Sequence, residues 1–331
     1  MSPRLPAVVL SCLAALVLAG CGGGTEGPQA GDATLLLDFQ PNAVHAGIYV
    51  AEARGFPQGE GVDLTVRTPG EGTDGIALLA ANRVDFAIVD IHDLALARQR
   101  GIDIEGVMAV VQRPLAAVLA QPGVRTPRDL EGRRVGVTGL ASDDAVLDTV
   151  VRGAGGDPKR VRRTQVGFDA VRNLVTRRVQ GATAFWNAEG VQWQAERPGA
   201  KVFRVDDYGA PAYPELVLAA RTSLVQDDPA LVQAVVTSLR RGYRAAVLAP
   251  EEAVTSLTDA VDGLDRAQVQ AQLDAVSPAF QNNAGAFGAF DEAALARWAT
   301  WEQRVGIVRT KPNVTLMFAP QFARGTISDG G

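Results

Sequence analysis

The most informative part of the sequence is Thr34-Leu35-Leu36-Leu37-Asp38-Phe39-Gln40-Pro41-Asn42-Ala43-Val44-His45. Its first four residues predict a short buried strand, and the polar residues around Pro41 predict a loop. A helix is expected from about His45 to Arg54, because the next residue, Gly55, is of the type that commonly ends helices. A strand, a loop and a helix in this order are typical of an α/β fold, in which helices cover a mostly parallel sheet.

The same alternation extends along the rest of the chain. Further strands are expected at 62–66, 84–89, 116–120, 134–137, 161–166, 182–185, 201–205 and 216–220. Helices are expected at 143–152, 170–177, 187–196, 229–249, 251–258, 265–276 and 291–305, and also after Asp74 and after Asp90. No period of about 20–50 residues recurs, which argues against a repeat protein. The pattern predicts two α/β units, the second of which starts near Leu115.

The composition favours a packed globular protein and excludes several functional classes. The chain has 331 residues, of which 47 % are hydrophobic, and it carries a formal net charge of −5. This length suits two lobes of about 100–200 residues each, and the acidic balance argues against a nucleic-acid partner. Both cysteines, Cys12 and Cys21, lie near the N-terminus, so no disulfide or cysteine metal site is expected in the folded part. We expect no catalytic residue, no cofactor and no metal ion.

The N-terminus predicts an exported and anchored protein. Arg4 precedes an apolar run over 5–18, which suits a signal-peptide core and is shorter than the about 20 residues of a membrane-spanning helix. The run ends in Leu18-Ala19-Gly20-Cys21, which is similar to the lipobox of bacterial lipoproteins. We therefore expect a signal peptide over 1–20, a lipid on Cys21, a flexible tether over 21–33 and an extracytoplasmic, lipid-anchored location. A chance cysteine at the end of an ordinary signal peptide is the alternative.

Three short motifs carry a resemblance to a known family. They are Asp38-Phe39-Gln40-Pro41-Asn42 with His45, then Phe185-Trp186-Asn187-Ala188-Glu189, and finally Asp207-Tyr208-Gly209 before Glu215. In these motifs the chain resembles the ABC-transporter solute-binding proteins for thiamine pyrimidine precursors, a family related to nitrate, sulfonate and taurine binders. The resemblance covers essentially the whole chain after the signal peptide, in order.

The resemblance implies a two-lobe periplasmic-binding-protein fold of type II. Lobe 1 would comprise 34–114 and 215–331, lobe 2 would comprise 115–214, and two crossings between them would form a hinge. The ligand, a 4-amino-2-methylpyrimidine with a hydroxymethyl or aminomethyl group, would be captured between the lobes by hinge closure and delivered to an ABC permease. A monomeric, membrane-anchored binding protein without enzymatic activity is expected.

The expected ligand contacts combine strand-end loops with the chemistry of a flat, amine-bearing ring. Open α/β sheets bind ligands beyond the carboxyl ends of their strands. Such a ring needs aromatic faces, carboxylates that accept from the amine, and donors for the ring nitrogens. The candidates are Phe39, Trp186 and Tyr208 as faces, Asp38, Asp90, Glu189 and Glu215 as acceptors, Asn42, His45 and Asn187 as donors, and Gly139 and Ser142 in the loop after the strand at 134–137. Loss of Trp186 or Glu189 is expected to weaken binding about tenfold or more.

Three alternatives stay open. Each candidate also has a structural explanation, such as a turn for Asp38, a helix cap for Asp90 or packing for Trp186. The ligand could instead be a sulfonate, nitrate, riboflavin or another flat heterocycle, and Arg113 is the candidate partner for an anion. A pyrimidine synthase-like enzyme of the same fold is less favoured, because the cysteine-rich element of such enzymes has no counterpart beyond Cys21.

Overall fold

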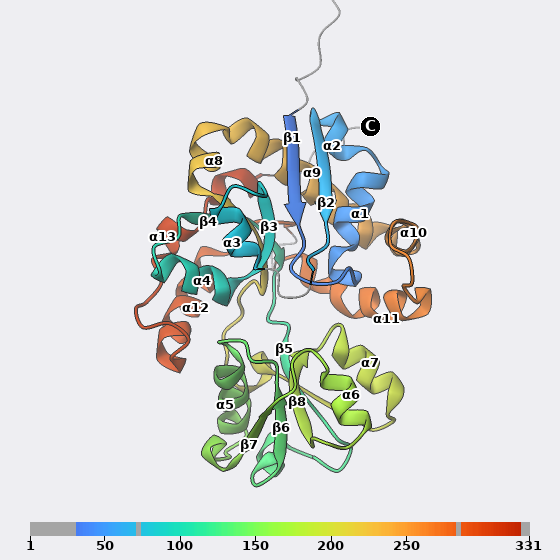
Figure 1. Cartoon of the computed structure of the whole chain (residues 1–331), viewed down its shortest axis with the longest axis vertical. Helices are drawn as coiled ribbons and strands as arrows, with labels where there is room; N and C mark the ends of the chain where they lie inside the picture. The colour runs from blue at the N-terminus through green and yellow to red at the C-terminus, as the bar shows by residue number, and fades with distance from the viewer. Residues whose placement is uncertain (1–30, 71–73, 283–285, 326–331) are drawn as a thin grey trace, which may run out of the picture.

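The computed structural model describes residues 31–70, 74–282 and 286–325 and folds them into two lobes joined by two crossing segments (Figure 1). The expected signal peptide, Cys21 and nearly all of the tether lie outside the described residues. Each lobe is built on one five-stranded sheet flanked by helices. The expected two-lobe α/β fold is therefore confirmed.

The sheet of lobe 1 has the strand order β2-β1-β3-β10-β4. Its strands are β1 (Gly31–Leu36), β2 (Val62–Arg67), β3 (Phe86–Asp90), β4 (Ile104–Val111) and β10 (Leu216–Arg221). Strand β1 pairs in parallel with β2 and β3, whereas β10 pairs antiparallel with both β3 and β4. Four strands therefore run in one direction, and β10 runs against them.

The sheet of lobe 2 repeats this arrangement in the order β7-β6-β8-β5-β9. Its strands are β5 (Ala116–Ala120), β6 (Arg134–Val137), β7 (Arg162–Gln165), β8 (Gly181–Phe185) and β9 (Lys201–Arg204). Here β6 is parallel to β7 and β8, and β5 is antiparallel to β8 and β9. In both lobes the reversed strand is the one that enters directly from a crossing, and the other strands share one direction as the sequence predicts.

Helices cover both sheets, and several begin at an aspartate that caps the first turn. Asp228, Asp265 and Asp291 each accept a hydrogen bond from a backbone N–H three residues later. The helices are α1 (Ala46–Ala53), α2 (Phe56–Gly59), α3 (Gly75–Ala80), α4 (Ile91–Gln99), α5 (Asp143–Gly153), α6 (Ala170–Val175), α7 (Glu189–Glu196), α8 (Thr222–Asp227), α9 (Pro229–Leu248), α10 (Pro250–Ala260), α11 (Arg266–Val276), α12 (Glu292–Val305) and α13 (Val314–Met317). His45 and Tyr208 each end a single helical turn, η1 (Ala43–His45) and η4 (Val205–Tyr208). Among the described residues, no helix combines the length and the apolar character needed to cross a membrane.

Strand β4 is the one strand that the sequence pattern does not predict. Its residues are buried on both faces apart from the half-buried Glu105, so polar and apolar residues do not alternate along it. The outer edge of β4 is covered by the chain after α13, where the carbonyl of Gly106 accepts from the N–H of Ala319 at 2.9 Å. Covering the edge in this way keeps a long apolar strand from pairing with other molecules.

Candidate ligand-binding site

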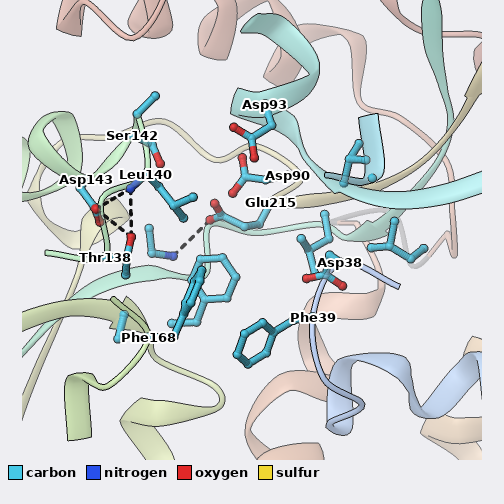
Figure 2. A pocket seen from close by; sticks show the side chains of 18 of the residues that line it. Asp38, Phe39, Asp90, Asp93, Thr138, Leu140, Ser142, Asp143, Phe168 and Glu215 are labelled. Atoms are coloured by element: carbon cyan, nitrogen blue, oxygen red, sulfur yellow. Dashed lines mark hydrogen bonds between the residues drawn. The ribbon is translucent and has the colours of Figure 1, made fainter. Parts of the chain in front are cut away.

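A cavity of about 490 Å³ lies between the two lobes (Figure 2). Its walls come from the loops that follow β1, β3, β6, β7 and β8, together with the two crossings at Ala116 and Glu215. These loops stand at the carboxyl ends of their strands, which is where open α/β sheets bind ligands. The volume falls within the range of about 300–1,000 Å³ that is typical of small-molecule sites.

Most of the candidate ligand contacts line this cavity. They are Asp38, Phe39, Asn42, Asp90, Ser142, Asn187, Glu189 and Glu215. The remaining candidates, His45, Gly139, Trp186 and Tyr208, are not among the lining residues. The structure thus brings the first group together and places the second group behind or away from the wall, while a direct ligand contact stays a prediction for each residue.

The loop after β1 is held by a hydrogen-bonded unit of Asp38, Asn42 and His45. The Asn42 side chain accepts from the N–H of Val44 at 3.0 Å, and the Asn42 N–H donates to Nδ1 of His45 at 3.1 Å. Because Nδ1 accepts, the ring proton of His45 lies on Nε2, which donates to Oδ1 of Asp38 at 2.8 Å. His45 is completely buried. It therefore positions the Asp38 carboxylate at the cavity wall from behind.

Two phenylalanine rings face each other across the lobes. Phe39 follows β1 in lobe 1 and Phe168 follows β7 in lobe 2, and their ring centroids lie 5.2 Å apart with an angle of 46° between the planes (Figure 2). Phe39 is 37 % exposed and Phe168 is 60 % exposed. Exposed aromatic faces on a cavity wall are suited to contact a flat ring. The pair therefore offers an aromatic surface that depends on both lobes.

Replacing Phe39 or Phe168 with alanine should weaken the binding of a flat aromatic ligand by about 5- to 150-fold, because a lost stacking partner costs about 1–3 kcal/mol. The free energy of unfolding should change by less than about 0.5 kcal/mol, since both rings are exposed. Calorimetric titration and thermal unfolding of each variant measure the two effects. Val175→Ala, at an exposed apolar residue of lobe 2 outside the cavity lining, is the control. Unchanged affinity in both phenylalanine variants would remove the pair from the site.

Asp143 organises the lobe 2 wall at the start of α5. Its Oδ2 accepts from Oγ1 of Thr138 at 2.7 Å and from the N–H groups of Gly139 and Leu140 at 2.6 and 3.0 Å. Its Oδ1 accepts from Oγ1 of Thr183 at 2.7 Å. Figure 2 shows part of this set as dashed lines. Gly139, which has a φ of 102°, thus gives its N–H to a carboxylate of the protein itself.

Two further side chains reach the cavity from the segment between β8 and α7. Asn187 is 1 % exposed, and its Oδ1 has no hydrogen-bond partner among the described residues. Glu189 accepts from the N–H of Phe185 at 3.3 Å, and burial raises the pKa of its carboxyl group. Both residues line the cavity and carry oxygen acceptors, so this wall is suited to a ligand that donates hydrogen bonds.

Glu215 ties the two crossings together beside the cavity. Its side chain is buried, and Oε2 accepts from the N–H groups of Leu115 and Ala116 on the other crossing. Its second oxygen, Oε1, has no hydrogen-bond partner among the described residues. In Figure 2 the carboxyl groups of Glu215, Asp90 and Asp93 lie next to one another. A strand end, a helix start and a crossing therefore bring three carboxyl groups to one end of the cavity.

These carboxyl groups raise one another's pKa values. Burial, and then repulsion by Asp90, raise the pKa of Glu215 to about 8 and the pKa of Asp93 to about 7. Burial also raises the pKa of Asp90. Burial alone would lower the pKa of the neighbouring His92, but the carboxylates of Glu302 and Asp90 outweigh it and raise that pKa to about 10. The charge of His92 is shared between two carboxylates, because its Nδ1 lies 2.8 Å from Oε2 of Glu302 and its Nε2 lies 3.9 Å from Oε1 of Glu215.

Trp186 lies at the hinge behind the cavity wall. Its indole Nε1 donates to the carbonyl of Pro114 at 2.8 Å, and its backbone N–H donates to the carbonyl of Leu115 at 2.9 Å. The guanidinium of Arg204 lies 3.9 Å from the ring centroid. The ring is 5 % exposed. Packing and hydrogen bonding at the crossing are the contacts that the structure shows for Trp186, and stacking on a ligand stays a prediction.

Tyr208 lies at the far end of helix α5. A Cβ atom on Gly153, the last residue of α5, would lie 2.2 Å from the Tyr208 carbonyl oxygen, and the Tyr208 ring meets Phe203 edge-on with a centroid distance of 6.0 Å. Helix α5 has 11 residues and is therefore about 16 Å long. Its first residue, Asp143, lines the cavity, so the helix separates Tyr208 from the cavity.

Several lining residues are not anticipated by the sequence analysis. Phe168 follows the strand at 161–166 by two residues, so the strand-end rule could have selected it. Asp93 and Asp143 stand in first helical turns, where a carboxylate is common for structural reasons alone. Nothing in the sequence distinguishes these carboxylates from ordinary helix-start residues, and only the fold brings them to the cavity.

The lining of the cavity is strongly acidic. It holds the carboxyl groups of Asp38, Asp74, Asp90, Asp93, Asp143, Glu189 and Glu215, against one guanidinium, that of Arg100, over the residues that the structure describes. Arg113, the candidate partner for an anion, pairs instead with Asp206 at 3.2 Å outside this lining. Such a cavity favours a ligand that carries positive charge or donates hydrogen bonds.

The two lobes and the cavity between them have the architecture of the periplasmic-binding-protein fold. The fold matches that of the periplasmic aliphatic sulphonate binding protein SsuA from Escherichia coli with a TM-score of 0.71 at 15 % sequence identity, over 92 % of this chain and 95 % of that chain. Residues 42–253 match the family described as NMT1/THI5 like. The chain belongs to the NMT1/THI5-like family, as its motifs predict.

Relatives of the chain are named for two different activities. It is 30 % identical over 303 residues to the formylaminopyrimidine-binding protein of Halalkalibacterium halodurans, covering 89 % of this chain and 92 % of that relative. It is 25 % identical over 184 residues to a 4-amino-5-hydroxymethyl-2-methylpyrimidine phosphate synthase of Saccharomyces cerevisiae, covering 52 % of this chain and 54 % of that enzyme. Of these two relatives, the one matched along nearly its whole length is named as a binding protein.

Proposed function

We propose that the protein is the solute-binding subunit of an ABC importer and captures a thiamine pyrimidine precursor between its lobes. The observation that carries the proposal is a cavity that combines the Phe39 and Phe168 rings with a wall of carboxyl oxygens. A 4-aminopyrimidine offers a flat ring to the phenylalanines and N–H donors to the carboxylates. The 30 % identity to a formylaminopyrimidine-binding protein supports the same ligand class.

The cavity is poorly suited to a sulfonate or nitrate ligand. An anion is commonly held by free backbone N–H groups at a helix start or by arginine. At the start of α5 the N–H groups of Gly139 and Leu140 already donate to Asp143. Binding an anion there would place it beside the Asp143 carboxylate, so a ligand with donors is favoured.

Hinge closure is the proposed means of capture. The cavity wall takes Asp38 and Phe39 from lobe 1 and Phe168, Asn187 and Glu189 from lobe 2. A ligand that contacts both sets of residues selects the arrangement in which the lobes are close together. The ligand then reaches the permease by reopening of the same hinge. The proposal treats the protein as a monomer, because one chain supplies both walls.

An enzyme is the second candidate, because some relatives are named synthases. The synthase similarity spans 52 % of this chain, and the sequence has no cysteine after Cys21. The cysteine-rich element that the family resemblance implies for such enzymes is therefore missing, and we favour binding without chemical change. Recovery of an added pyrimidine unchanged after long incubation would support this choice, whereas its conversion would overturn it.

The ligand class can be tested by mass spectrometry and calorimetry on the soluble domain that starts after Cys21. Denaturing the purified domain should release a compound with the mass of a substituted 4-aminopyrimidine. Titration with 4-amino-5-hydroxymethyl-2-methylpyrimidine should show one site per chain, and titration with taurine, a sulfonate, should show none. Binding of taurine but of no pyrimidine would contradict the proposal.

We also propose that the protein is anchored outside the cytoplasm by a lipid on Cys21. Because the thiol of Cys21 would carry the lipid, Cys21→Ala should move the full-length protein from the membrane fraction to the soluble fraction. Cell fractionation followed by a carbonate wash measures this, and Cys12→Ala is the matched control. A Cys21→Ala protein that stays with the membrane would argue against the lipid anchor.

A further inference from the structure

The carboxyl groups of Asp90, Asp93 and Glu215 form an acidic end of the cavity, and this acidic end has a geometric origin. Asp90 is the last residue of β3, Asp93 lies in the first turn of α4, and Glu215 directly precedes β10. Strand β10 pairs with β3 so that Leu216 lies opposite Asp90. The pairing of a crossing with a strand end therefore fixes three carboxyl groups together on one wall (Figure 2).

The cation beside the acidic end is the imidazolium of His92, which pairs with the carboxylate of Glu302. Nδ1 of His92 lies 2.8 Å from Oε2 of Glu302, and Nε2 lies 3.2 Å from the hydroxyl of Tyr213. Both His92 and Glu302 are buried, and Nε2 of His92 also lies 3.9 Å from Oε1 of Glu215, so this pair adjoins the acidic end from behind the wall. The guanidinium of Arg100, the one cation among the described lining residues, belongs to an exposed residue at the end of α4. The three carboxyl groups of the acidic end and that of Glu302 therefore outnumber the one buried cation beside them among the residues that the structure describes.

The Glu215 side chain is an independent indication that a ligand binds at the acidic end of the cavity. Its Oε2 is held by two backbone N–H groups, so the carboxyl group cannot turn away from the cavity wall. Its Oε1 is buried and has no hydrogen-bond partner among the described residues, since Nε2 of His92 lies 3.9 Å away, within ion-pair distance but beyond hydrogen-bond distance. A buried acceptor without a donor costs free energy unless a ligand or water supplies one. A donor from the ligand would complete this carboxyl group.

We propose that the acidic end of the cavity binds a positively charged amino group of the ligand, so that the protein prefers 4-amino-5-aminomethyl-2-methylpyrimidine over its hydroxymethyl and formylaminomethyl counterparts. This inference rests on the proposed function and names the member of the ligand class that the site selects. The primary ammonium group of that compound supplies three N–H donors and one positive charge. These match a cluster in which the carboxyl groups outnumber the one buried cation, that of His92.

The same geometry disfavours the uncharged counterparts. A hydroxymethyl group supplies one donor and no charge, so it satisfies at most one carboxyl oxygen. A formylated amino group has lost its charge and adds a carbonyl oxygen, which can only accept hydrogen bonds. Placing that oxygen against the ionised carboxylates of Asp90, Asp93 and Glu215 sets acceptors against acceptors. The ring itself is the same in all three compounds, so its contacts with Phe39 and Phe168 do not discriminate among them.

The inference also sets the sign of the pH dependence. With the pKa of Asp93 near 7 and that of Glu215 near 8, part of the cluster is protonated at neutral pH without ligand. The groups that face Asp93 are Asp74, Asp90, His92 and Arg100, and those that face Glu215 are Asp90, His92, Tyr213 and, through His92, Glu302. An ammonium group favours the ionised carboxylates and displaces their protons. Affinity for the aminomethyl compound should therefore rise between about pH 6 and pH 7.5, with proton release.

The experiment is calorimetric titration of the soluble domain with the three pyrimidines at pH 7.5. The aminomethyl compound should bind about tenfold or more tightly than either counterpart. Titration in two buffers of different ionisation enthalpy should show proton release for the aminomethyl compound and little for the hydroxymethyl compound. Asp93→Asn and Glu215→Gln should each reduce the preference about tenfold, while Glu196→Gln, which removes an exposed carboxylate outside the cavity lining, should leave it unchanged.

The outcomes separate the inference from the proposed function. Equal affinity for the three pyrimidines, or tighter binding of the formylated one, overturns the inference and leaves the proposed function intact. Binding of none of them contradicts the proposed function itself. Glu215→Gln keeps an oxygen for the two backbone N–H groups, and thermal unfolding checks that it folds. If it does not, Asp93→Asn decides, and an unchanged preference in that variant overturns the inference.

Discussion

Replacing Trp186 with alanine is expected to lower the free energy of unfolding by about 3–5 kcal/mol, as large-to-small changes of buried aromatic residues do. The indole is 5 % exposed, and the change removes the hydrogen bond to the Pro114 carbonyl and the contact with Arg204. Pro114 lies in the segment that crosses between the lobes. Arg204 ends β9, which pairs with β5, the strand that follows this crossing. Removing the ring therefore loosens the hinge as well as the packing.

Chemical denaturation of the ligand-free domain measures this effect, and Trp186→Phe is the matched control. Phenylalanine keeps most of the buried area and loses the indole N–H, so it should cost about 1–2 kcal/mol. A Trp186→Ala domain with unchanged stability and strongly reduced pyrimidine affinity would favour the stacking role that the family resemblance implies. The structure favours the opposite result, because the ring is buried behind the cavity wall.

Replacing Asp143 with alanine is expected to lower the free energy of unfolding by about 2–4 kcal/mol. The change removes the acceptor of three donors, namely the hydroxyls of Thr138 and Thr183 and the N–H of Gly139. The N–H of Leu140 loses one of its two acceptors and keeps Oγ1 of Thr138 at 3.2 Å. Each buried donor that loses its partner costs about 1–3 kcal/mol, and the exposed ones recover hydrogen bonds from water. The loop at 138–142 should lose its fixed position, so pyrimidine affinity should fall as well.

The adjacent Asp144 provides the control for this prediction. Its side chain is exposed and pairs with Arg163 at 2.7 Å on the surface, so Asp144→Ala should cost less than about 1 kcal/mol. Urea unfolding of the two variants measures the difference between them. Equal losses of stability would show that Asp143 contributes no more than a surface charge, and that the loop is held by other contacts.

The architecture could be predicted from the sequence to a large extent because its signals are local. Short segments predict the alternation of apolar strands with helices. Examples are the apolar run 34–37 with the helix that ends before Gly55, and the apolar run 84–89 with Asp90 at the start of the next helix. Strand β4 was not predictable in this way, since burial on both faces removes the alternation that marks a strand. The reversed direction of β5 and β10 is a property of the crossings, and no residue type within those strands encodes it.

The sequence predicts residues of the site only where they follow the end of a predicted strand. Asp38, Asn42 and Asp90 were selected by that rule and line the cavity, whereas Trp186 also stands at a strand end and turns to the hinge. Whether a side chain at a strand end points into the cavity or toward the hinge depends on its partners. These partners, such as the Pro114 carbonyl for Trp186, are distant in sequence. His45 illustrates the same limit, because its role depends on bonds to Asp38 and Asn42 that the motif alone does not show.

The position of β10 between β3 and β4 has a consequence for the order of folding. All five strands of the lobe 2 sheet come from one continuous segment, 116–204, so that sheet can form by itself. In lobe 1, by contrast, β4 pairs with no strand other than β10 among the described residues, and β10 follows it by more than a hundred residues of chain. Until residues 216–221 are in place, β4 exposes an apolar edge that can pair with another molecule. Lobe 1 is therefore expected to fold more slowly than lobe 2 and to be the half more prone to aggregation while incomplete, although its first strand comes first in the chain.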